Sequence, residues 1–113
     1  MPFVKFDDLE KEFVTPKHST AYGETITGQA IEVGRLTFKK GEGATPHAHP
    51  QEQIMYILSG RVRVELVGET AELGPGEAFH ALPQQTHQVT ALEDTTVLST
   101  KNTIDGIGHK MRD

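Results

Sequence analysis

Residues 41–60 read GEGATPHAHPQEQIMYILSG, and this stretch joins two closely spaced histidines to a run of five apolar residues. Successive side chains of a β-strand point to opposite faces, so His47 and His49 share one face and a single ion can reach both. A turn then starts the next strand, where Gln53 faces inward beside the histidines and Glu52 lies in the turn or faces away. Alternation therefore favours Gln53 over Glu52 as an oxygen ligand.

A third nitrogen has to come from a distant strand, and His87 is the best candidate because it opens a strand just after the turn at 83–86. The chain has no cysteine, so histidine, carboxylate or amide groups must hold any metal. Three imidazoles and one amide oxygen leave open positions on a divalent ion, which is typical of a catalytic site. The alternative is that the two close histidines are exposed in a turn and the third is unrelated.

Short runs with alternating apolar and polar residues, broken by Gly, Pro or polar pairs, continue along most of the chain. This pattern predicts an all-β protein, an antiparallel sandwich or barrel. We expect strands at 30–39, 44–49, 53–59, 61–67, 70–73, 78–82, 87–91 and 95–101, a short helix at 7–13, and an edge strand or arm at 19–26. The expected organisation is a single domain over residues 1–113, with an N-terminal arm and edge strand at 1–29, a barrel at 30–101 and a tail at 102–113.

Composition narrows the possible partners. The chain has 113 residues, 35% of them hydrophobic, and a net charge of −5 with no basic run. Nucleic acid is therefore an unfavourable partner, because phosphate binding needs clustered Lys and Arg. The N-terminus carries charges where a signal peptide would be apolar, and no window approaches ~18 apolar residues, so we expect a cytoplasmic protein with no membrane partner.

The spacing of Gly41, His47-Ala48-His49, Gln53 and Gly60 resembles the first motif of the cupin family, G-x5-H-x-H-x3-E-x6-G, with Gln in the Glu position. The resemblance implies a small antiparallel β-barrel of the jelly-roll type, also called a double-stranded β-helix. It also implies a divalent metal, Fe, Mn, Ni or Zn, and usually a homodimer. The implied metal ligands are His47, His49, Gln53 and His87.

The second cupin motif, G-x5-P-x-G-x2-H-x3-N, is matched at Gly76 and His87. Its Pro, Gly and Asn positions are occupied by other residues, which are Leu82, Gln84 and Ala91.

Within the cupins, residues 47–60 are most similar to small proteins of the pectin-degradation KdgF type. That group helps to convert unsaturated uronates released from pectin or alginate. Its C-terminal pattern, D-V-F-x-P-P-R-x-D, supplies Asp and Arg residues that handle substrate. Here Ser99 replaces the Asp, and Asp105 stands near the Arg position.

The neutral amide of Gln53 would cancel none of the metal's charge, so the ion would be a stronger Lewis acid than with a carboxylate ligand. Such an ion favours polarising a carbonyl or hydroxyl and binding an anion. We therefore expect a metal-dependent enzyme that isomerises, ring-opens or eliminates from a small oxygenated anionic substrate such as a sugar acid. Two alternatives stay open, an Fe(II) dioxygenase and a non-enzymatic module that binds a small ligand.

Lys101 is the candidate catalytic residue besides the metal. It shares a strand face with Ser99, and if that face is inward, Lys101 could contact a substrate anion or act as an acid or base. The alternative, which the sequence favours, is a solvated lysine at the strand end.

Four further polar residues have no assigned role. Arg35 lies on a strand with two plausible core faces, and His80 could line the cavity mouth or face outward. We expect His18 and His109 at the surface.

Apolar residues on the outer face of the strand after Gln53 fit a homodimer contact; these are Ile54, Tyr56 and Leu58.

Overall fold

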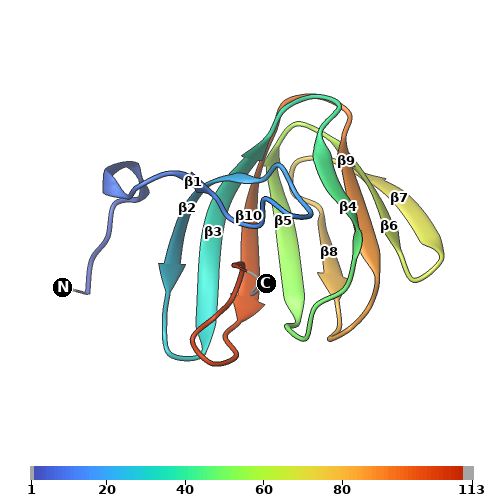
Figure 1. Cartoon of the computed structure of the whole chain (residues 1–113). Helices are drawn as coiled ribbons and strands as arrows, with labels where there is room; N and C mark the ends of the chain where they lie inside the picture. Colours follow the sequence, from blue (N-terminus) through green and yellow to red (C-terminus); the bar gives the residue numbers. More distant parts are fainter. Residues whose placement is uncertain (1, 111–113) are drawn as a thin grey trace.

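The computed structural model describes residues 2–110, which form two antiparallel sheets packed face to face (Figure 1). The first sheet has the strand order β1-β2-β3-β10-β5-β8, and the second has the order β4-β9-β6-β7. A short 3-10 helix, η1 (Phe6–Asp8), precedes them. The strands are β1 (Glu12–Phe13), β2 (Tyr22–Thr27), β3 (Ile31–Phe38), β4 (Gly43–His47), β5 (Gln53–Ser59), β6 (Val62–Leu66), β7 (Glu69–Leu73), β8 (Ala78–Ala81), β9 (His87–Ala91) and β10 (Thr95–Asn102). The predicted all-β fold is confirmed.

The predictions for the N-terminal region need correction. The helix predicted at 7–13 is wrong, because the chain makes only the short turn of η1 and then pairs β1 with β2. The Phe13 and Tyr22 rings lie 4.8 Å apart across this pairing. The strand predicted at 19–26 exists as β2, but it lies between β1 and β3 and not at the sheet edge. Pairing across the sheet is favoured here because one short turn cannot make enough helical hydrogen bonds to be stable alone.

The core lies between the two sheets and follows the expected alternation. Met55 and Ile57 on β5 and Val89 and Ala91 on β9 are all buried. On β3, whose inward face the sequence left open, the buried side chains include Leu36 and Phe38.

Arg35 on β3 consequently faces away from the barrel interior. It forms ion pairs with Glu24 at 3.2 Å and with Asp7 at 2.7 Å. Its guanidinium also lies 5.5 Å from the centre of the Phe6 ring. Arg35 therefore anchors the N-terminal segment on the outer face of β2 and β3, and it does not reach the site.

Gly60 shows why the motif carries glycine at the turn between β5 and β6. Its φ angle is +90°, a left-handed conformation that other residues adopt only with strain. A Cβ atom at this position would lie 2.4 Å from the carbonyl oxygen of Asp94. Only glycine fits both requirements.

The segment between β1 and β2 closes one side of the barrel and crosses in front of the sheets in Figure 1. Two backbone hydrogen bonds hold it to β4. The Thr20 N–H donates to the Gly43 carbonyl at 2.9 Å, and the Thr45 N–H donates to the His18 carbonyl at 2.8 Å. Val14 and Ala21 in this segment are buried. Among residues 2–110, no helix is long and apolar enough to span a membrane.

Candidate metal centre

Three histidines meet inside the barrel between β4 and β9. His47 and His87 pair directly across these strands, and His49 follows β4. One ring nitrogen from each of the three lies within 4.8 Å of the others. The predicted strand 44–49 is two residues too long, since β4 ends at His47. His49 nevertheless faces inward because its loop turns back, with the amide of Gln84 donating to the His49 carbonyl at 2.8 Å.

Backbone carbonyls set the tautomer of all three imidazoles. Each Nδ1 donates to a carbonyl oxygen two residues away: His47 to Thr45 at 2.7 Å, His49 to Gln51 at 2.9 Å and His87 to Gln85 at 2.9 Å. A neutral imidazole with a proton on Nδ1 presents a lone pair on Nε2. The three Nε2 atoms are thus the free donors of the cluster, the arrangement that metal-binding histidines commonly have.

The amide of Gln53 completes the cluster. Its Nε2 donates to Ser99 Oγ at 2.9 Å, and its Oε1 lies 3.1 Å from His49 Nε2. Both atoms of this second contact carry lone pairs and neither carries a proton, so the pair is repulsive unless a cation lies beside it. The donor set therefore fits a divalent ion. Glu52, the rejected candidate, is exposed and contacts His80.

Burial keeps the cluster neutral. Burial, with a smaller contribution from the charge of Lys101, lowers the pKa of His49 to about 4. Burial also lowers the pKa of His47 and that of His87. Neutral imidazole is the form that binds a metal. At neutral pH these ligands are therefore already deprotonated and can bind without first releasing a proton.

Lys101 is buried on the inward face of β10, so the alternative of a solvated lysine is wrong. In the sheet it lies opposite Gln53 on β5 and Glu32 on β3. Burial lowers its pKa to about 8, and the charge of Glu32 partly offsets this effect. Its positive charge in turn lowers the pKa of all three clustered histidines.

Two site residues were missed by sequence reasoning. His109, expected at the surface, is buried and bonds to Glu32 and Ser99. Glu32 shares the inward face of β3 with Leu36, so parity along that strand could have found it. Nothing in the irregular sequence around His109 could have done so.

His18, the other histidine expected at the surface, is half-buried. Its ring stacks on that of His47, with the ring centres 5.5 Å apart. The segment between β1 and β2 therefore touches the histidine cluster directly.

The space beside the cluster is small. A cavity of about 30 Å³ touches three members of the cluster and His109. Its other lining comes from the core and from four residues of the segment between β1 and β2, namely Val14, Thr15, Ser19 and Ala21. This volume is large enough for an ion and about one or two waters.

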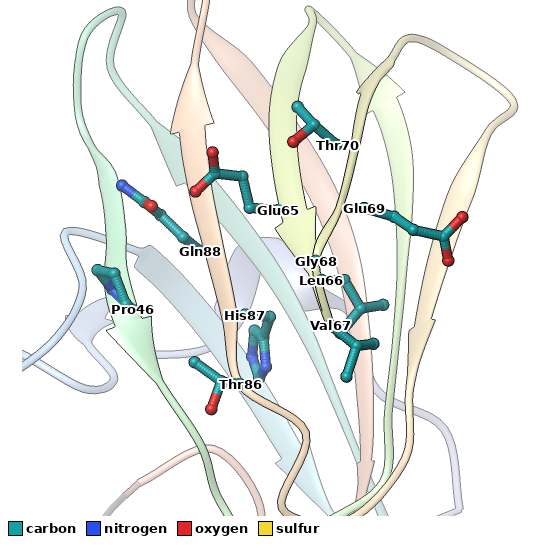
Figure 2. A pocket seen from close by; sticks show the side chains of 10 residues that line it. All are labelled: Pro46, Glu65, Leu66, Val67, Gly68, Glu69, Thr70, Thr86, His87 and Gln88. Carbon is teal, nitrogen blue, oxygen red and sulfur yellow. The ribbon is translucent and has the colours of Figure 1, made fainter.

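A larger hollow of about 340 Å³ lies beside β6, β7 and β9. Figure 2 shows the residues that line it. His87 lines both this hollow and the small inner cavity. The hollow also carries Glu65 and Glu69, whose charges disfavour an anion.

The fold and the cluster define a small β-barrel protein with an interior three-histidine centre suited to a divalent metal ion. The family described as the cupin domain matches residues 34–100, and the chain belongs to this family.

Among characterised relatives, the chain is similar to the pectin degradation protein KdgF of Dickeya dadantii, with 39% identity over 62 residues. The match covers 54% of this chain and 56% of that protein, so it spans little more than half of the relative. The sequence resemblance to small cupins related to KdgF is confirmed.

Solved structures agree with this assignment. KdgF from Halomonas sp. has 28% identity and a TM-score of 0.79, with 90% of this chain and 93% of that chain covered. An RmlC-like cupin from Shewanella frigidimarina has a TM-score of 0.81 at 19% identity, with 92% of each chain covered. At that identity the second likeness shows the fold alone.

Proposed function

We propose that the chain is a metal-dependent enzyme whose centre is held by His47, His49, His87 and Gln53 and acts on a small oxygenated anion such as a sugar acid. The observation that supports this most is the neutral donor set beside a buried lysine. The reaction class we propose is isomerisation, ring opening or elimination.

The charges of the interior favour an anion. Three neutral imidazoles and a neutral amide would leave a divalent ion with its full charge, and Lys101 adds a further positive charge. Burial raises the pKa of Glu32, but hydrogen bonds from His109 and Thr27 outweigh it and hold the pKa at about 2. The single negative charge of Glu32 therefore leaves a net positive interior.

A divalent ion bound there would supply a Lewis acid that polarises a carbonyl or hydroxyl oxygen of the substrate. Lys101 would supply the second group. With a pKa of about 8 it changes protonation near neutral pH, which suits a general acid or base. Its ammonium form would also bind a substrate carboxylate.

Substrate entry requires movement. A sugar acid does not fit a cavity of about 30 Å³, because small-molecule sites usually have several hundred Å³. The segment between β1 and β2 covers the cavity and is held to β4 by few backbone hydrogen bonds. We propose that this segment shifts to admit the substrate.

The test uses the purified full chain, stripped of metal and reloaded in turn with Fe(II), Mn(II), Ni(II) or Zn(II). Unsaturated uronates from pectin and alginate are the substrates, because the chain is similar to a pectin degradation protein. We expect metal-dependent loss of the unsaturated uronate, abolished by His49→Ala and strongly reduced by Lys101→Met. The exposed His80→Ala serves as the matched histidine control. Undiminished turnover by the stripped protein would contradict the proposal.

The same samples separate the alternative functions. Oxygen uptake with Fe(II) and a diketone or phenolic substrate would favour a dioxygenase. Tight binding of a small ligand without turnover under any metal would favour a binding module. The buried position of Lys101 favours the enzyme, because a pure binding module needs no group that transfers protons.

For the assembly, we propose a homodimer through the outer face of β5. Ile54, Tyr56 and Leu58 are 48%, 42% and 41% exposed on one strand, an apolar strip that a second copy could cover. Sedimentation analysis should give a dimer that Tyr56→Asp disrupts, whereas a monomeric wild-type protein would contradict this. The cytoplasmic location also stays a prediction, which cell fractionation tests.

A further inference from the structure

A chain of buried hydrogen bonds leads from Gln53 away from the histidine cluster. Gln53 Nε2 bonds Ser99 Oγ at 2.9 Å, and Ser99 Oγ lies 2.8 Å from His109 Nε2. His109 Nδ1 in turn lies 2.5 Å from Glu32 Oε1. All four side chains are buried, and Ser99 has no exposed surface. We call Ser99, His109 and Glu32 the relay.

The direction of each hydrogen bond follows from Glu32. As a carboxylate it only accepts, and it receives the backbone N–H of His109 at 2.8 Å, the His109 ring and the hydroxyl of Thr27 at 2.5 Å. The His109 proton is therefore on Nδ1. Burial lowers the pKa of His109, which favours the neutral ring, and Nε2 of that ring accepts a hydrogen bond from the Ser99 hydroxyl. Ser99 then has only lone pairs to offer Gln53.

The amide of Gln53 consequently has one favourable orientation. Its N–H group must face Ser99, so its carbonyl oxygen must face the histidines, where Oε1 lies 3.1 Å from His49 Nε2. The opposite orientation would place the carbonyl oxygen against the lone pairs of Ser99 and an N–H group toward a cation. Both contacts would then be unfavourable.

The order Ser99, His109, Glu32 is also that of an activated serine nucleophile. That role is disfavoured here because Ser99 is completely buried and its oxygen already accepts a hydrogen bond from Gln53. In this structure Ser99 Oγ is held between Gln53 Nε2 and His109 Nε2 and has no exposed surface for a substrate carbonyl. The relay can orient the amide but cannot attack a substrate.

The C-terminal segment is built to deliver His109 to this position. Gly108 packs on Glu32 so closely that a Cβ atom would lie 2.7 Å from Glu32 Cβ. Gln51, in the loop between His49 and Gln53, donates to the Ile107 carbonyl at 3.1 Å and holds the same segment. The loop of the histidine cluster and the C-terminal segment are thus joined.

We propose that Ser99, His109 and Glu32 are positioning residues that hold the Gln53 carbonyl oxygen toward the metal and match the site to an amide instead of a carboxylate. The inference rests on the proposed function in one respect, which is that Gln53 is a ligand. A glutamate at position 53 would need a hydrogen bond from the Ser99 hydroxyl, and that hydroxyl already donates to His109. The relay thereby accounts for glutamine where the cupin motif has glutamate.

The first test measures Ni(II) binding to the metal-free full chain by calorimetry. His109→Phe leaves the Ser99 hydroxyl free to rotate, and Ser99→Ala removes it, so in both variants the amide loses its preferred orientation. We expect binding about tenfold weaker in each, the low end for residues that support metal ligands. Asp105→Asn, an exposed change in the same segment that tolerates the left-handed backbone at this position, should bind as the wild type does.

The decisive experiment introduces Gln53→Glu into the wild type and into His109→Phe. In His109→Phe the freed Ser99 hydroxyl can donate to the new carboxylate, whereas in the wild type it cannot. We expect Gln53→Glu to improve Ni(II) affinity about tenfold more in the His109→Phe background than in the wild type. Equal effects in the two backgrounds would overturn the proposal, because loss of packing alone predicts no such coupling.

A second readout needs no metal. The side-chain amide signals of Gln53, identified by their loss in Gln53→Glu, should exchange slowly in the wild type and move and exchange faster in Ser99→Ala. Unchanged signals would overturn the relay. If His87→Ala binds Ni(II) as the wild type does, the proposed metal centre fails, while the amide signals of the metal-free protein still decide the relay.

Discussion

The three clustered histidines and His109 lie in similar surroundings but use their ring nitrogens differently. All are buried or half-buried, and burial lowers the pKa of each imidazole. Each clustered histidine uses Nδ1 on a backbone carbonyl, which leaves the lone pair of Nε2 without a hydrogen-bond donor. The nearest side-chain atom to His49 Nε2 in a polar contact is the Gln53 carbonyl oxygen, itself an acceptor. His109 uses both of its ring nitrogens on side chains.

This difference separates a ligand from a support. A histidine with one nitrogen held by the backbone is fixed in orientation and still has a lone pair for a metal. A histidine with both nitrogens in hydrogen bonds has no lone pair for a metal. It can only fix the orientation of the side chains that it contacts. Burial and pKa alone would not distinguish the two regions, whereas the count of engaged nitrogens does.

The largest effect should come from removing a free nitrogen. We expect His87→Ala to lose stoichiometric metal entirely, because two imidazoles and one amide hold a divalent ion much more weakly than three and one. Elemental analysis of the purified protein measures this, with the exposed His80→Ala as control. Full occupancy in His87→Ala would place the metal elsewhere.

Acid should destabilise the metal-free protein through the clustered histidines. The pKa of His49 is about 4 in the folded state, against 6.5 as its ordinary value, so the unfolded chain binds more protons between these pH values. Stability is therefore present above pH 6.5 and is lost as pH falls toward 4, by about 3 kcal/mol at ~1.4 kcal/mol per pKa unit. Denaturant unfolding across this range measures it.

The contribution of Glu32 to stability can be separated from that of the clustered histidines in the same pH titration, because it is lost over a different pH range. Its folded pKa of about 2 lies below the ordinary 4.5, so its contribution is present above pH 4.5 and is lost only below that value. Glu32→Gln should remove the loss below pH 4.5 and keep the loss between 6.5 and 4. A single acid transition unaffected by Glu32→Gln would contradict this separation.

Metal should stabilise the clustered region. A ligand at 100 times its dissociation constant adds about 2.7 kcal/mol to the free energy of unfolding. We expect Ni(II) at that ratio to raise the melting temperature of the wild type, and a chelator to reverse the rise. His49→Ala should show no rise, and a rise of equal size in that variant would contradict the ligand assignment.

The smallest effect concerns Lys101. Its charge lowers the pKa of His49 and of His87, so Lys101→Met should raise both values in the metal-free protein. NMR titration of the ring protons measures the shift, with exposed His80 as the reference. Unchanged values for both histidines would place the Lys101 ammonium away from the cluster.

Much of the site could be predicted from sequence because it depends on local geometry. Two-residue alternation puts Gln53 inward and Glu52 outward, whatever the rest of the chain does. The spacing from Gly41 to Gly60 resembles the cupin motif, and Gly60 has the positive φ that the turn requires. The inward faces of β5 and β9 followed from the same alternation.

Only the tertiary structure decided what depends on contacts between distant segments. From the sequence, either face of β3 could point inward. In the structure Leu36 packs between the sheets, so Glu32, on the same face, is buried opposite Lys101. His109 lies in an irregular segment without periodicity, so only the fold could bring it to a residue 77 positions earlier in the chain. The sequence by itself determined which residue types could hold a metal, because strand alternation is local. The tertiary structure decided which buried groups orient them, because that depends on hydrogen bonds between segments remote in sequence.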